Sequence, residues 1–108
     1  MYWIGMATFP DKKTAQTTAQ KLLENRLIAC ANMVSDVESH YLENGKTKQA
    51  KETILFFKTR AEQATNAIRF LEEHHPYQTP VIETWSTGKT NAKAAQWVLR
   101  ETNWPKKK

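Results

Sequence analysis

Residues 37–58, with the sequence VESHYLENGKTKQAKETILFFK, predict a long β-hairpin, and this hairpin decides the fold. The side chains alternate in character from Val37 to Leu42, which is the period of a β-strand. Asn44-Gly45 follows and is the strongest short-range signal for a hairpin turn. The chain then returns through residues 53–58 as the partner strand.

The strands of this hairpin are expected to be unusually long and apolar. Each spans about 14 residues, whereas strands usually have five or six. The returning strand contains Ile54-Leu55-Phe56-Phe57, and such a run is typical of a strand buried on both faces. A long hairpin also leaves unpaired edges that a soluble protein has to cover. We therefore expect a second subunit to cover this face and the edges.

The remaining segments complete a pattern of strands and helices around the hairpin. The spacing predicts a strand over residues 2–9 and a helix over residues 12–25 with Asp11 as its N-cap. The strand that enters the hairpin begins at Leu27 and runs to Leu42. Thr59 and Glu62 match a capping box that starts a second helix, which Pro76 ends. Residues 79–85 predict a fourth strand, and residues 92–102 a last helix with Asn91 as its N-cap.

This order predicts an α+β fold: a ferredoxin-like βαββαβ sandwich with an extra C-terminal helix. Its sheet is antiparallel and four-stranded, with the helices on one face. At 108 residues the chain has the size of one domain. We assign residues 1–105 to this domain and residues 106–108 to a basic tail.

Composition excludes several classes of function. The formal net charge is +5, but Lys106, Lys107 and Lys108 carry part of it, and the other basic residues alternate with glutamates. This pattern does not predict nucleic-acid binding. A mean hydropathy of −0.69 argues against membrane insertion. Cys30 is the only cysteine, so no intramolecular disulfide forms, and we expect a cytoplasmic protein.

The segment His74-His75-Pro76-Tyr77 carries the candidate metal site. Two adjacent imidazoles are two potential donors, and histidine is the commonest metal ligand. Transition metals prefer three or four donors, so an assembly that brings rings of several subunits together would make a better site. The alternative is structural: an imidazole at the end of a helix complements the helix dipole. No catalytic triad and no Gly-rich phosphate cradle is present, so we expect neither an enzyme nor an organic cofactor.

Two further residues have plain structural interpretations. Cys30 lies in an apolar run, and a free cysteine is among the most often buried residue types. Lys58 ends a buried strand, where it either pairs with a carboxylate or binds an anion.

Five segments together resemble the CutA divalent-cation-tolerance proteins. They are residues 26–32 (RLIACAN), Tyr41, Gly45-Lys46, Lys58-Thr59, and His74-His75-Pro76-Tyr77 with Pro80. Their order and spacing agree from Ala7 to Trp97. The resemblance implies a cytoplasmic homotrimer joined through the long hairpins, linked to tolerance of copper and other divalent metals, with Cu(II) near His74 and His75. It implies no catalytic reaction.

The shape is also similar to the PII signalling trimers, so the alternative function is a sensor or adaptor that binds a small molecule or a partner protein in intersubunit clefts.

The sequence departs from the family pattern at three places. The hairpin contains no tryptophan between Tyr41 and Gly45, which removes a bulky aromatic from the interface. Ala7 stands where some bacterial relatives carry a copper-binding cysteine, and Gln78 stands where a glutamate often follows the His-Pro-Tyr motif. Both departures remove a potential metal donor.

Overall fold

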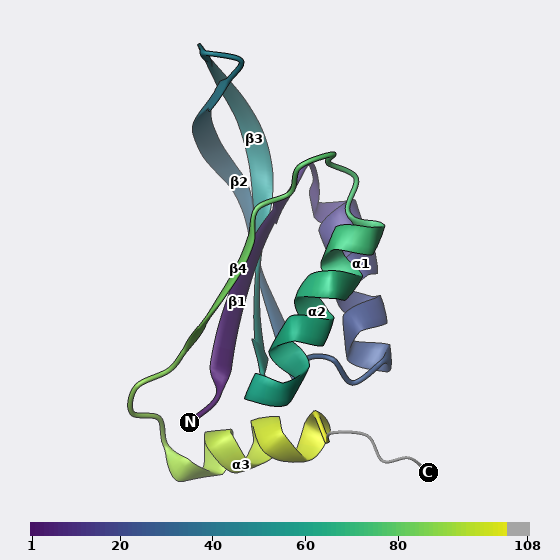
Figure 1. Cartoon of the computed structure of the whole chain (residues 1–108), viewed down its shortest axis with the longest axis vertical. Coiled ribbons are helices and arrows are strands. Elements are labelled where there is room, and N and C mark those ends of the chain that lie inside the picture. Colours follow the sequence, from purple (N-terminus) through teal and green to yellow (C-terminus); the bar gives the residue numbers. More distant parts are fainter. Residues whose placement is uncertain (104–108) are drawn as a thin grey trace.

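The computed structural model describes residues 1–103 and confirms the α+β fold. The tail at residues 106–108 lies outside these described residues. The elements are β1 (Trp3–Phe9), α1 (Lys12–Glu24), β2 (Cys30–Glu43), β3 (Lys46–Thr59), α2 (Ala61–His74), β4 (Ile82–Ser86) and α3 (Ala92–Glu101). The strands form one sheet in the order β2-β3-β1-β4, and every neighbouring pair is antiparallel. In Figure 1, α1 and α2 lie side by side over one face of this sheet, and α3 lies across its lower end.

The long hairpin is confirmed. β2 and β3 have 14 residues each. Residues 37–43 of β2 and 46–52 of β3 pair only with each other, beyond the ends of β1 and β4. Figure 1 shows the hairpin as an arm that projects past the helices. Asn44 and Gly45 both have positive φ, 53° and 76°, which is the backbone that a two-residue hairpin turn of type I′ requires. One feature was not expected: a bulge between Val34 and Val37, where Asp36 has a φ of 60°.

Three sequence predictions of local structure are wrong. β2 begins at Cys30 and not at the predicted Leu27, because Leu27 and Ile28 form a connection. Ile28 is buried there and belongs to the core. β4 begins at Ile82 and not at the predicted residue 79, because it pairs with β1 only from Trp3 to Ala7. The N-cap of α2 is Arg60, without a side-chain bond, because Thr59 completes β3 and its hydroxyl donates to the Leu27 carbonyl at 2.7 Å.

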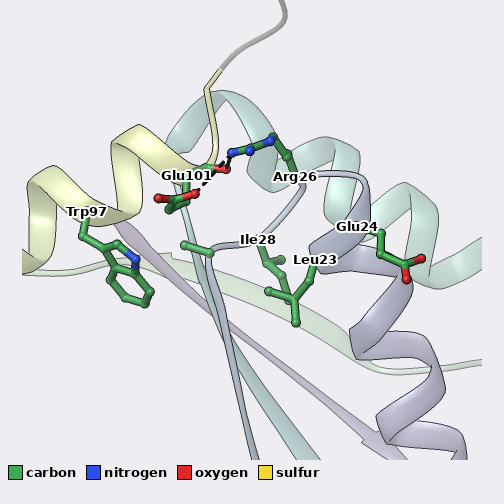
Figure 2. A pocket seen from close by; sticks show the side chains of 7 residues that line it. Leu23, Glu24, Arg26, Ile28, Trp97 and Glu101 are labelled. Atoms are coloured by element: carbon green, nitrogen blue, oxygen red, sulfur yellow. Dashed lines mark hydrogen bonds and ion pairs between the residues drawn. The ribbon is translucent and has the colours of Figure 1, made fainter.

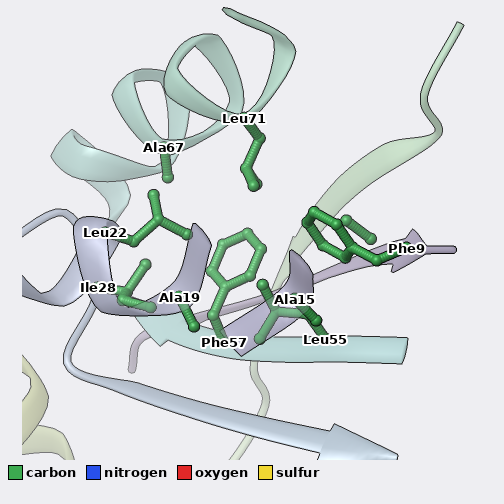
Figure 3. Close-up of a cluster of buried hydrophobic side chains, with 10 residues drawn as sticks. Phe9, Ala15, Ala19, Leu22, Ile28, Leu55, Phe57, Ala67 and Leu71 are labelled. Carbon is green, nitrogen blue, oxygen red and sulfur yellow. The ribbon is translucent and has the colours of Figure 1, made fainter. Parts of the chain in front are cut away.

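The core lies between the sheet and the two long helices (Figure 3). On β3 the residues of odd number face the helices, and Leu55 and Phe57 are fully buried there. Ile54 and Phe56 point to the opposite face, which no helix covers, and they are half-buried. The four apolar residues therefore divide into two pairs, one for the core and one for the uncovered face.

Gly5 in β1 makes room for the central aromatic ring of this core. It is the cross-strand partner of Phe57, and a Cβ built on Gly5 would lie 2.0 Å from Cζ of that ring. Any side chain at position 5 therefore overlaps Phe57. By contrast, a Cβ at Gly88 meets nothing within 4 Å.

We expect Gly5→Ala to destabilise the fold by about 1–3 kcal/mol, the usual cost of overpacking a core. Denaturant unfolding followed by tryptophan fluorescence measures this change. Gly88→Ala is the matched control and should leave the midpoint nearly unchanged. An equal effect of the two substitutions would contradict the contact between Gly5 and Phe57.

Candidate functional site

His74 is the last residue of α2, and its ring has one nitrogen available. Nδ1 donates to the carbonyl of Phe70, one turn earlier, at 2.8 Å. The ring stacks on Phe70 with a centroid separation of 4.0 Å. Among residues 1–103, Nε2 has no hydrogen-bond partner, and the side chain is exposed. Nε2 can therefore offer its lone pair to a ligand.

His75 follows in extended backbone and is held more tightly. Its Nε2 donates to the carbonyl of Thr8 at 2.8 Å, and its Nδ1 accepts from the Tyr77 backbone N–H at 3.1 Å. Since a carbonyl can only accept, this pattern sets the neutral tautomer with the proton on Nε2. The ring also stacks on Phe9, at 4.4 Å between centroids. Burial lowers the pKa of His75 below its ordinary value of 6.5, although the Thr8 bond and the Glu52 charge act in the other direction.

Tyr77 ties the same loop to the base of the hairpin. Its hydroxyl donates to the Glu52 carboxylate at 2.5 Å, across 25 residues of sequence. Burial raises the pKa of Tyr77 far above its usual value, and the bond to Glu52 acts in the same direction. Sequence reasoning missed Glu52 and Phe9, because only the fold brings β1 and β3 to this loop.

The two rings therefore have different surroundings. His74 packs on its own helix, whereas His75 packs on β1. Nowhere in residues 1–103 do three or more His, Cys, Asp or Glu side chains converge as a metal-binding group. A metal ion at this helix end would take one or two imidazoles from one chain and complete its coordination elsewhere.

Cys30, Asn32 and Lys58 form a small polar cluster on the uncovered face of the sheet. The Lys58 ammonium donates to Oδ1 of Asn32 at 3.0 Å and lies 4.0 Å from the sulfur of Cys30. Lys58 thus bonds an amide oxygen within the chain, and its pairing with a carboxylate across an interface or with an anion stays a prediction. Cys30 is half-buried and free.

A pocket of about 340 Å³ lies between the end of α1 and α3, remote from the histidines (Figure 2). Leu23, Ile28 and Trp97 line it with apolar surface. At its rim the Arg26 guanidinium donates to the backbone carbonyl and to the carboxylate of Glu101, at 3.1 and 3.3 Å. Arg26 thereby fastens the end of α3, since carbonyls at a helix C-terminus lack partners within the helix.

The sequence and the fold of this chain are similar to those of known proteins. The family profile described as "CutA1 divalent ion tolerance protein" matches residues 3–101. The chain belongs to the CutA1 family. A protein of Thermococcus kodakarensis called divalent-cation tolerance protein CutA is 33% identical over 97 residues, covering 90% of this chain and 92% of the relative.

Solved CutA1 structures have the same fold. The divalent ion tolerance protein CutA1 of Ehrlichia chaffeensis superposes with a TM-score of 0.91 at 32% identity, covering 95% of this chain and 96% of that one. A protein of Archaeoglobus fulgidus described as the periplasmic divalent cation tolerance protein CutA gives the same TM-score at 26% identity, covering 95% and 100%. Within residues 1–103, no helix is long and apolar enough to cross a membrane.

We expect the stability of this CutA1 chain to depend on pH through His75. Because its pKa is lowered in the folded state, the unfolded chain takes up a proton at a pH where the folded chain does not. The free energy of unfolding should therefore fall as the pH is lowered from about 7 to about 5. Urea unfolding over a pH series measures this fall.

His75→Gln should reduce the dependence on pH, and His40→Gln, on the exposed hairpin, should retain it. The assignment fails if the His75 variant shows the same dependence as the wild type.

Proposed function

We propose that this chain is a divalent-cation tolerance protein that binds Cu(II) at His74 and His75, and that it acts as a cytoplasmic homotrimer. In this proposal copper is the ligand that the protein handles, and no catalytic step takes place. The family of the chain supports the general role. The arrangement of the two imidazoles supports the site.

The observation that carries the copper site is the backbone bond that each ring makes. Nδ1–H of His74 donates to the Phe70 carbonyl, and Nε2–H of His75 donates to the Thr8 carbonyl. Histidines that ligate metals usually donate their other ring N–H to a carbonyl or carboxylate, which fixes the tautomer and aims the free nitrogen. The tautomer of both rings is set in this way, which favours ligation at the free Nε2 of His74 and, once the Tyr77 N–H is released, at Nδ1 of His75.

The two nitrogens differ in how easily they bind a metal. Nε2 of His74 is exposed and free, whereas Nδ1 of His75 first has to release the Tyr77 N–H. A neutral hydrogen bond contributes about 0.5–1.5 kcal/mol net. We therefore propose that His74 binds copper first and that His75 joins at a modest cost. Water or a neighbouring protomer supplies the remaining donors, because Cu(II) prefers tetragonal coordination.

Replacing both histidines with alanine should abolish stoichiometric Cu(II) uptake in calorimetric titration of the metal-free protein. His74→Ala alone should lower the copper affinity more than His75→Ala does. Loss of an outer-shell partner of a metal ligand lowers metal affinity by about 10–100-fold, and loss of either histidine should lower it by at least as much. His40→Ala is the matched control, since it removes an exposed imidazole on the hairpin. Unchanged copper binding in the double variant would refute the site and favour the sensor or adaptor function.

The uncovered face of the sheet supports the homotrimer. It presents a continuous set of apolar side chains, of which Val34 and Trp85 are 47% and 43% exposed. The other members of the set are Ile4, Met6, Ile54 and Phe56. Large contiguous apolar surfaces of this kind mark protein interfaces. The edges of β2 and β4 and the projecting hairpin add unpaired backbone that further protomers can cover.

The two neighbouring phenylalanines test this assembly separately. Phe57→Asp should prevent folding, because it buries an unpaired charge in the core. Phe56→Asp should leave each protomer folded but dissociate the trimer, because its side chain lies on the uncovered face. Light scattering with circular dichroism distinguishes the two results. A trimeric Phe56→Asp protein would refute burial of this face between protomers.

A further inference from the structure

A second cavity, of about 310 Å³, lies in the groove between α1 and the end of α2. Figure 1 shows the two helices side by side on the face of the sheet opposite to the uncovered one. The cavity is lined by Lys13, Thr14, Thr17, Thr18, Lys21 and His74. This lining is basic and hydroxylic, and it contains no carboxylate.

The lining residues of α1 follow from helical spacing. Lys13, Thr17 and Lys21 are four residues apart and therefore lie along one side of the helix. At 1.5 Å per residue the two lysines start about 12 Å apart, and their long side chains can close on a ligand between them. All three side chains are exposed, so the groove is open to solvent.

The charges in the groove are available to a ligand. Within residues 1–103, neither Lys13 nor Lys21 makes an ion pair. Asp11, the N-cap of α1, keeps its negative charge and attracts Lys13, but its carboxylate is held by the Thr14 backbone N–H at 2.7 Å. Glu24 accepts from Gln20 at 3.2 Å. Lys13 and Lys21 thus place two positive charges along the groove, and these attract an anion.

The hydroxyls add directional donors. Thr18 already donates to the Thr14 carbonyl at 2.9 Å. In the described part of the chain, the hydroxyls of Thr14 and Thr17 have no side-chain hydrogen bond, so both can donate to an oxygen in the groove. Ammonium and hydroxyl donors around a cavity are the partners that phosphate oxygens prefer.

We propose that this groove binds a small phosphate-bearing anion of the size of pyrophosphate, held by Lys13, Lys21 and Thr17. The ring of His74 also lines the cavity, but the positive charge of the groove comes from the two lysines. The site goes beyond the copper function and does not depend on it. Assembly through the uncovered face of the sheet leaves the groove accessible.

Calorimetric titration of the metal-free, full-length protein with pyrophosphate, orthophosphate and sulfate at constant ionic strength tests the proposal. We expect saturable binding of one pyrophosphate per chain, tighter than that of orthophosphate or sulfate. Because a hydrogen bond to a charged group contributes about 1.5–3 kcal/mol, Lys13→Gln and Lys21→Gln should each lower the affinity by about tenfold or more. Thr17→Val should lower it by a smaller factor.

Lys12→Gln is the matched control, because it removes the same charge from the same helix outside the cavity. Its affinity should fall by a clearly smaller factor than that of Lys13→Gln, since Lys12 does not line the cavity and salt partly screens its exposed charge. An equal loss in Lys12→Gln, or no saturable binding of any of the three anions, overturns the proposal. All these positions are exposed or half-buried on the helix surface, so thermal unfolding should verify that the variants remain folded.

Copper titration of the same variants separates the two sites. Lys13→Gln and Lys21→Gln should retain Cu(II) uptake even where they lose pyrophosphate. His74→Ala should weaken copper binding while the lysines still bind the anion. A loss of both ligands in every variant would overturn the assignment of an independent anion site.

Discussion

The ring of Phe57 lies over Gly5, and the rest of the sheet depends on this contact. The two residues are directly paired between β3 and β1, the central strands, so the ring fills the middle of the core. An aromatic ring over a cross-strand glycine excludes water from a backbone that no side chain covers. Because side chains alternate along a strand, placing Phe57 toward the helices also places Phe56 toward the other face. One contact thus sets which residues of β3 are core and which are surface.

The uncovered face is the consequence of that alternation. A small domain has too few helices to cover both faces of a four-stranded sheet, and α1 and α2 both lie on one side. The half-buried Ile54 and Phe56 belong to the face on which we propose that the protomers assemble. The long hairpin adds further open backbone, because half of β3, residues 46–52, has no third strand beside it. The fold and the proposed assembly therefore depend on the same strand pattern.

The end of α2 shows how one short motif serves two tasks. His75 bonds the Thr8 carbonyl and stacks on Phe9, while Tyr77 bonds Glu52, so the loop joins β1 to the base of the hairpin. His74, one residue earlier, is left with an exposed nitrogen beside a groove of lysine and threonine side chains. Each ring is thus oriented by its own partners, His74 by Phe70 and His75 by Thr8 and Phe9.

The sequence by itself determined the element order, the hairpin with its Asn44-Gly45 turn, and the end of α2 before Pro76. These features depend on local rules: the period of a strand, the backbone of a tight turn, and the effect of proline on the residue before it. It also identified the histidine pair as the candidate site. Only the tertiary structure decided that Thr59 bonds Leu27 and does not cap α2, that Ile28 is core and not strand, and that the two rings face different neighbours. Each of these depends on contacts between segments far apart in the chain, such as Thr8 with His75 and Glu52 with Tyr77, and no local pattern carries that information.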